Sequence, residues 1–166
     1  AIQKLKEIEK RVANGGSPAF EDEQRILAQY TGWGGLSDAF DPNKSAWSNE
    51  YSQLKAALSE SEYEAARSST LTAFYTPATV IHPIYRALER FGVKGGKILE
   101  PSMGTGAFLA HGHFGSSDAK FYGVELDSIT GRISKQLYQK ANIQVTGYEN
   151  ALLPDNYFDC SIGNVP

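Results

Sequence analysis

The chain has 166 residues, of which 41% are apolar and 21% are charged, and its formal net charge is −3 at pH 7. This length allows one core with an appendage and excludes two full domains. We find no apolar run that could cross a bilayer and no signal peptide, so we expect a cytoplasmic protein without a membrane partner. The single cysteine, Cys160, excludes an internal disulfide, and the acidic balance gives no electrostatic footprint for nucleic acid in this chain alone.

Residues 1–70 predict a helical N-terminal appendage. The first helix is indicated by apolar residues at helical spacing up to Val12, followed by the glycines of NGG. Further helices are expected over 20–30, 49–58 and 60–67, the last of them opened by Ser59 and Glu62 as a capping box. Between them, YTGWGGLSDAFDP predicts an ordered loop whose Trp33 packs onto a neighbouring surface.

Residues 71–166 predict a second part in which helices and strands alternate. Thr76 and Pro77 suit the N-cap and first position of an apolar helix that stops at Gly92. Strands are expected over 97–101, 120–126, 143–148 and 157–163, with a helix over 128–138. This alternation indicates an α/β fold with a mostly parallel sheet.

The segment KILEPSMGTGAFL, residues 97–109, predicts a strand, a glycine turn and the start of a helix. Gly104 and Gly106 would let backbone N–H groups approach a ligand closely. Glu100 at the strand end would repel a pyrophosphate and suits a cationic group instead. Leu109 stands where the dinucleotide pattern has its third glycine, so an NAD or FAD site fits poorly.

A second acid, Glu125, ends the next predicted strand, 19 residues after Gly106. At this spacing a carboxylate reaches the ribose hydroxyls of a bound nucleoside. Asp127 is the competing acid, but strand alternation places Glu125 nearer the cleft. Leu126 would then lie against an adenine ring.

Several motifs resemble those of the gamma-type N6-adenine DNA methyltransferases over residues 74–166. LEPSMGTG is similar to their motif I, FYTP to motif X, GVELD to motif II and GNVP to motif IV. Glu149 is the motif III candidate, although register could equally select Tyr148 or Asn150. The resemblance implies a truncated Rossmann-like methyltransferase fold with strand order 3-2-1-4. It implies that S-adenosylmethionine is bound by Phe74, Tyr75, Thr76, Glu100, Pro101, Ser102, Gly104, Gly106, Glu125, Leu126 and Glu149.

The same resemblance assigns catalysis to Asn164, Val165 and Pro166, whose amide and backbone oxygens would accept hydrogen bonds from an amine being methylated. Val165 departs from the family, which usually has proline there. The implied reaction is methyl transfer to adenine N6 in DNA, on a base flipped from the duplex. The alternatives are protein glutamine N5-methylation and a cofactor-binding fragment without catalysis. His111 and His113 lack a third ligand nearby, so no metal site is expected.

The run YTGWGGLSDAF and the segment GVELDSITGRISKQLY resemble large methylases and helicase-methylases of conjugative elements and phages. We therefore expect an N-terminal piece of a longer protein that meets DNA through its full length and is inactive as an isolated fragment. The last predicted strand would be left at an open sheet edge, which we expect to be covered by self-association or to be poorly ordered.

Overall fold

The computed structural model describes residues 1–112 and 119–165, and its centre is a parallel sheet of four strands. The strands are β1 (Lys97–Glu100), β2 (Lys120–Glu125), β3 (Asn142–Val145) and β4 (Cys160–Ser161). They are arranged in the order β3-β2-β1-β4, and every pair is parallel. The α/β, Rossmann-like class and the strand order predicted from the sequence are both confirmed.

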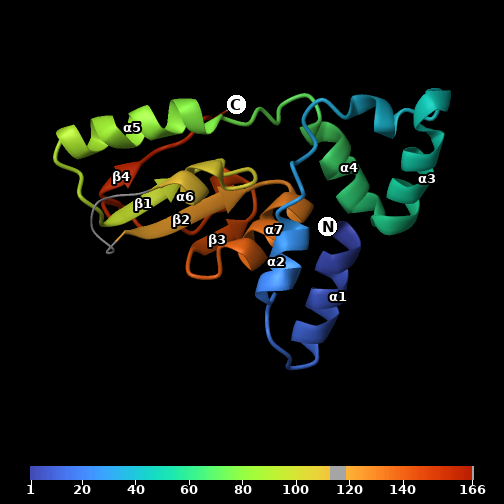
Figure 1. The fold of residues 1–166 in the computed structure, drawn as a ribbon, viewed down its shortest axis with the longest axis horizontal. Coiled ribbons are helices and arrows are strands. Elements are labelled where there is room, and N and C mark those ends of the chain that lie inside the picture. The colour runs from blue at the N-terminus through green and yellow to red at the C-terminus, as the bar shows by residue number, and fades with distance from the viewer. Residues whose placement is uncertain (113–118, 166) are drawn as a thin grey trace.

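The described residues form seven α-helices. They are α1 (Ile2–Ala13), α2 (Glu21–Leu27), α3 (Ser48–Ala57), α4 (Glu60–Ser69), α5 (Ala78–Arg90), α6 (Ala107–His111) and α7 (Ser128–Leu137). Three short 3₁₀ turns are η1 (Ser37–Phe40), η2 (Ser45–Trp47) and η3 (Tyr148–Asn150). Figure 1 shows α1 and α2 beside α7, with α5 running along the part of the sheet that holds β1 and β4. None of the helices in the described ranges combines the length and apolar character needed to cross a bilayer.

Four local predictions need correction. The third strand ends at Val145 rather than residue 148, where the 3₁₀ turn η3 begins. The second helix ends at Leu27 rather than residue 30, because the chain turns there into the glycine-rich loop. The cap of α5 is Pro77 and no side chain caps it, so the role predicted for Thr76 is wrong. The last strand is shorter than expected, because the Asp159 carboxylate accepts the Lys97 N–H at 2.8 Å where a longer ladder would run. The capping box predicted at α4 is confirmed by its two bonds between Ser59 and Glu62.

The described residues form three apolar clusters, of which the smallest contains Met103, Leu109 and Ile143 and the two larger ones join helices to the sheet layer. One joins β1, α5, α6 and the residue after β4 through Ile98, Ile81, Phe108 and Ile162. The other is built by the N-terminal helices and includes Ile129 and Ile133 of α7. The N-terminal helices therefore bury their apolar faces against a helix of the sheet layer.

An ion cluster on the same side reinforces this contact. Arg132 of α7 donates from Nε to Glu9 Oε1 at 2.6 Å and from Nη1 to Glu62 Oε1 at 2.5 Å, and Lys6 Nζ lies 3.0 Å from Glu62 Oε2. Burial raises the pKa of Glu62, but the hydrogen bonds from Arg132, the Ser59 backbone and Lys6 outweigh it and lower that pKa to about 2. Its stabilising contribution is thus present above the ordinary pKa of 4.5 and is lost as the pH falls toward 2.

We expect Arg132→Leu to lower the free energy of unfolding by about 2 kcal/mol at pH 7, because Glu9 and Glu62 would lose their shared partner while half-buried. Urea unfolding measures the loss. The control is Arg67→Leu, which breaks an exposed ion pair with Glu64 and should cost under about 0.5 kcal/mol. Equal losses in the two variants would contradict a role for the cluster in holding the helices to α7.

Candidate functional site

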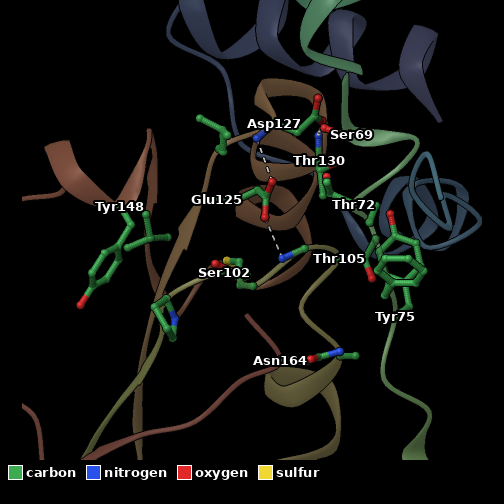
Figure 2. Close-up of a pocket in the computed structure, with 18 of the residues that line it drawn as sticks. Ser69, Thr72, Tyr75, Ser102, Thr105, Glu125, Asp127, Thr130, Tyr148 and Asn164 are labelled. Atoms are coloured by element: carbon green, nitrogen blue, oxygen red, sulfur yellow. Dashed lines mark hydrogen bonds between the residues drawn. The ribbon is translucent and has the colours of Figure 1, made fainter. Parts of the chain in front are cut away.

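A cavity of about 290 Å³ opens where the carboxyl ends of the parallel strands meet. Ligands of open α/β sheets bind at this edge. The lining comes from the glycine turn after β1 with the start of α6, the end of β2 with Thr130 of α7, the segment after β3, Asn164 after β4, and residues 69–76 with Trp33. The lining residues labelled in Figure 2 are Ser69, Thr72, Tyr75, Ser102, Thr105, Glu125, Asp127, Thr130, Tyr148 and Asn164.

The glycine turn is fixed to the sheet and to α7. Met103 N donates to Val124 O at 2.9 Å, and the turn ends at Gly106, which caps α6 with φ +79°. A Cβ on Gly106 would lie 2.4 Å from Tyr138 Cε2, so both the left-handed backbone and the close ring require glycine there. Gly106 is buried and does not line the cavity, whereas Gly104 does.

Glu125 lines the cavity, and its carboxylate joins the backbone of Gly104 to that of Asp127 by two hydrogen bonds (Figure 2). Its Oε2 accepts the Gly104 N–H and its Oε1 accepts the Asp127 N–H, both at 2.8 Å. Burial raises the pKa of the Glu125 carboxyl above its ordinary value, although these backbone N–H groups act in the opposite direction. The side chain thus ties the glycine turn to the end of β2.

Asp127 is the second acid of this edge, and its bonds are structural. Its Oδ1 caps α7 by accepting the Thr130 N–H at 2.7 Å and accepts the Trp33 indole N–H at 3.2 Å. Its Oδ2 is buried and has no hydrogen-bond partner within residues 1–112 and 119–165. The sequence left open which of the two acids faces the cavity, and both line it. Glu125 bridges the glycine turn and the end of β2, whereas Asp127 caps α7 and binds Trp33.

Glu100 ends β1 directly before the lining residues Pro101 and Ser102 but does not itself line the cavity. It is 3% exposed, and its Oε2 is buried without a hydrogen-bond partner among the described residues. Burial, and secondarily the charge of Glu125, raises the pKa of Glu100 to about 9. A buried acid with an unused oxygen is a site that a cationic group could satisfy.

Aromatic and apolar side chains surround the cavity mouth. Phe74 and Leu126 are about three-quarters exposed, and Tyr148 is 55% exposed. Tyr75 lies across the cavity from Tyr148 in Figure 2, and Thr76 also contributes to the lining. Apolar groups left this exposed beside a cavity are typical of a surface that receives a ligand.

Two of the remaining predicted residues also line the cavity. Asn164 lines the cavity and is exposed (Figure 2), and Glu149 lines it with Oε1 accepting from Asn150 Nδ2 at 2.9 Å. Val165 is 59% exposed and does not line the cavity. Pro166 lies outside the described residues, as does His113. Among the residues that the structure describes, no cluster of three or more metal-ligating side chains occurs.

Sequence reasoning missed Trp33, Ser69 and Thr72, all of which line the cavity from the N-terminal part of the chain. Ser69 and Thr72 carry no recognisable pattern in sequence. The glycines on both sides of Trp33 predict that its ring packs closely against a neighbouring surface, but they do not indicate which surface.

Comparisons with known proteins add two relatives, while no family model matches the chain. The chain is 29% identical over 153 residues to the defence against restriction protein B of Escherichia phage P1, covering 91% of this chain and 5% of that protein. It is 33% identical over 94 residues to the modification methylase CviBIII of Paramecium bursaria Chlorella virus NC1A, covering 56% of this chain and 25% of that protein. The chain therefore spans only a small part of the relatives it matches.

Solved structures with a related architecture were also found. A candidate class I S-adenosylmethionine-dependent methyltransferase from Listeria monocytogenes aligns with a TM-score of 0.48 and 14% identity, over 99% of this chain and 57% of that one. The plantazolicin methyltransferase BpumL in complex with SAH aligns with a TM-score of 0.44 and 20% identity, over 98% and 49% of the two chains.

Proposed function

We propose that this chain is the S-adenosylmethionine-binding part of a methyltransferase that acts on N6 of adenine in DNA. The observation that carries the proposal is the cavity at the carboxyl edge of the sheet. There the glycine turn, Glu125 and Asn164 face one enclosed space, although they come from three different strand ends.

The described residues fit the proposed cofactor. Glu100 offers a buried carboxyl with an unpartnered oxygen for a cationic amino group, and Glu125 offers acceptor oxygens for ribose hydroxyls. Leu126, Tyr148 and Glu149 would take the adenine, with apolar faces and one acid for its amino group. When bound, S-adenosylmethionine supplies a methyl group activated by its sulfonium.

Asn164 would act on the substrate side of the cavity. Its amide oxygen can accept a hydrogen bond from an amine, which raises electron density on a nitrogen whose lone pair is otherwise drawn into its ring. The Val165 backbone carbonyl, next in the chain, would accept the second amine hydrogen. Two such acceptors would orient the nitrogen toward the methyl group of the cofactor, so no stronger base is needed.

The substrate class is supported by the resemblance of FYTP and GNVP to motifs of adenine methyltransferases. It is also supported by the names of the two relatives, a modification methylase and a protein of defence against restriction. We propose that DNA is met by the full-length protein of which this chain is a part.

The substrate is tested by incubating that full-length protein with methyl-labelled S-adenosylmethionine, unmethylated DNA and a protein extract. We expect label in DNA as N6-methyladenine, reduced at least about a hundredfold by Asn164→Ala. Label in glutamine side chains of protein, with DNA unlabelled, would contradict the adenine assignment.

A further inference from the structure

Trp33 lies where the aromatic core of the N-terminal helices meets the cavity. It is 4% exposed, and its ring packs edge to face against Tyr30 and Phe40, with centroids 5.6 and 5.5 Å away. The ring of Phe40 in turn packs against that of Tyr63, with a distance of 5.1 Å between the ring centroids. A row of aromatic contacts therefore leads from the helical part of the chain to a residue that lines the cavity.

Both N–H groups of Trp33 are bonded to cavity residues. The indole Nε1 donates to Asp127 Oδ1 at 3.2 Å, and the backbone N donates to Tyr75 Oη at 3.1 Å. Asp127 follows β2, whereas Tyr75 precedes α5, so one residue fixes two separate walls of the cavity.

The bond to Asp127 continues to the glycine turn through hydrogen bonds, and the bond to Tyr75 holds a ring that borders the same turn. Asp127 N donates to Glu125 Oε1, and Glu125 Oε2 accepts from Gly104 N, both at 2.8 Å. On the other wall, the Tyr75 ring lies at van der Waals distance from the space above Gly104, where a Cβ would be 3.5 Å from Tyr75 Cε1. The two paths from Trp33 thus meet at Gly104.

The loop around Trp33 is shaped for this contact. Gly32 has φ +86°, and a Cβ there would lie 1.5 Å from Tyr75 Oη, so only glycine allows the hydroxyl to approach the loop. Gly35 N donates to Thr70 O at 3.3 Å, which ties the same loop to the end of α4. The loop is held from the helical side and from the cavity side.

We propose that Trp33 is a positioning residue of the cofactor pocket, which makes the N-terminal helices part of the binding unit. Trp33 touches both Asp127 and Tyr75, and through them it sets where Glu125 and Gly104 meet a ligand. This role rests on the proposed function, since the ligand is the same S-adenosylmethionine.

The test compares Trp33→Phe with Tyr63→Phe by calorimetric titration with S-adenosylmethionine. Trp33→Phe keeps an aromatic ring and removes the indole N–H. The control, Tyr63→Phe, removes a buried hydroxyl that donates to Phe40 O at 3.2 Å, the same length as the Trp33 bond, in the same apolar cluster. We expect Kd to rise about tenfold in Trp33→Phe and to stay within about twofold in Tyr63→Phe, at similar losses of thermal stability.

A spectroscopic readout separates positioning from stability alone. Because the chain has two tryptophans, Trp47→Phe leaves Trp33 as the one indole fluorophore. Its emission should change on cofactor addition and saturate at the calorimetric Kd. Suppose that the unsubstituted chain binds S-adenosylmethionine. An equal Kd in Trp33→Phe, or a Trp33 emission that the cofactor leaves unchanged, then overturns the positioning role alone. Absence of binding by the unsubstituted chain contradicts the proposed function and the positioning role together.

Discussion

Glu125→Gln is expected to weaken S-adenosylmethionine binding about a hundredfold, or about 2.7 kcal/mol. Both carboxylate oxygens accept backbone N–H groups, from Gly104 and from Asp127. A glutamine has the same shape, but one of its ends is an NH₂ donor, which would face one of these N–H donors. The variant therefore breaks the bridge between the turn and β2 as well as the acceptor proposed for ribose.

The matched control is Glu64→Gln, which removes the same charge from an exposed surface pair with Arg67. Titration calorimetry on both variants, with thermal melts to confirm folding, measures the difference. If Glu125→Gln folds and binds S-adenosylmethionine as tightly as Glu64→Gln, then Glu125 does not act in the pocket as proposed.

Glu100→Gln is expected to stabilise the folded chain at alkaline pH while weakening cofactor binding. The pKa of Glu100 rises from the ordinary 4.5 to about 9 on folding, so the folded state holds a proton that the unfolded state releases. A raised pKa gives stability that is complete below pH 4.5 and is lost as the pH climbs toward 9, at up to about 1.4 kcal/mol per pH unit. The amide cannot ionise, so the variant escapes this loss.

We expect the advantage of the variant over the unsubstituted chain to grow by about 4 kcal/mol between pH 5 and pH 8, as measured by urea unfolding at both pH values. At pH 8 its Kd for S-adenosylmethionine should be about tenfold weaker, because the partner for a cationic amino group is gone. Parallel pH–stability curves for the two proteins would show that Glu100 does not carry the raised pKa.

The strand order was predictable because the resemblance to methyltransferases over residues 74–166 implies the order 3-2-1-4. The alternation of helices and strands alone predicts only a mostly parallel sheet. The length of β4 was not predictable in the same way. Its apolar residues predict a strand over 157–163, but the Asp159 side chain takes the Lys97 N–H, a bond that no local pattern indicates. The ends of short strands depend on such side-chain competitors.

The candidate site was accessible from sequence where its residues follow strand ends or belong to the FYTP motif, residues 74–77. Glu125 and Gly104 could be placed together, since parallel strands bring their carboxyl ends to one edge. Trp33 lines the same cavity although it precedes its hydrogen-bond partner Asp127 by 94 residues in the sequence. The N-terminal helices bring it there by packing on α7. Contacts of that range follow from tertiary packing and leave no periodic signature. The burial of Glu100 was likewise hidden, because a strand-end acid is usually solvated.

The assignment of the cavity to S-adenosylmethionine is tested most directly by calorimetric titration of the unsubstituted chain at pH 7.5. We predict saturable binding at one site per chain, lost or strongly weakened in Glu125→Gln and retained in Glu64→Gln. Absence of heat and of any thermal stabilisation at millimolar S-adenosylmethionine would contradict the assignment of this cavity to the cofactor.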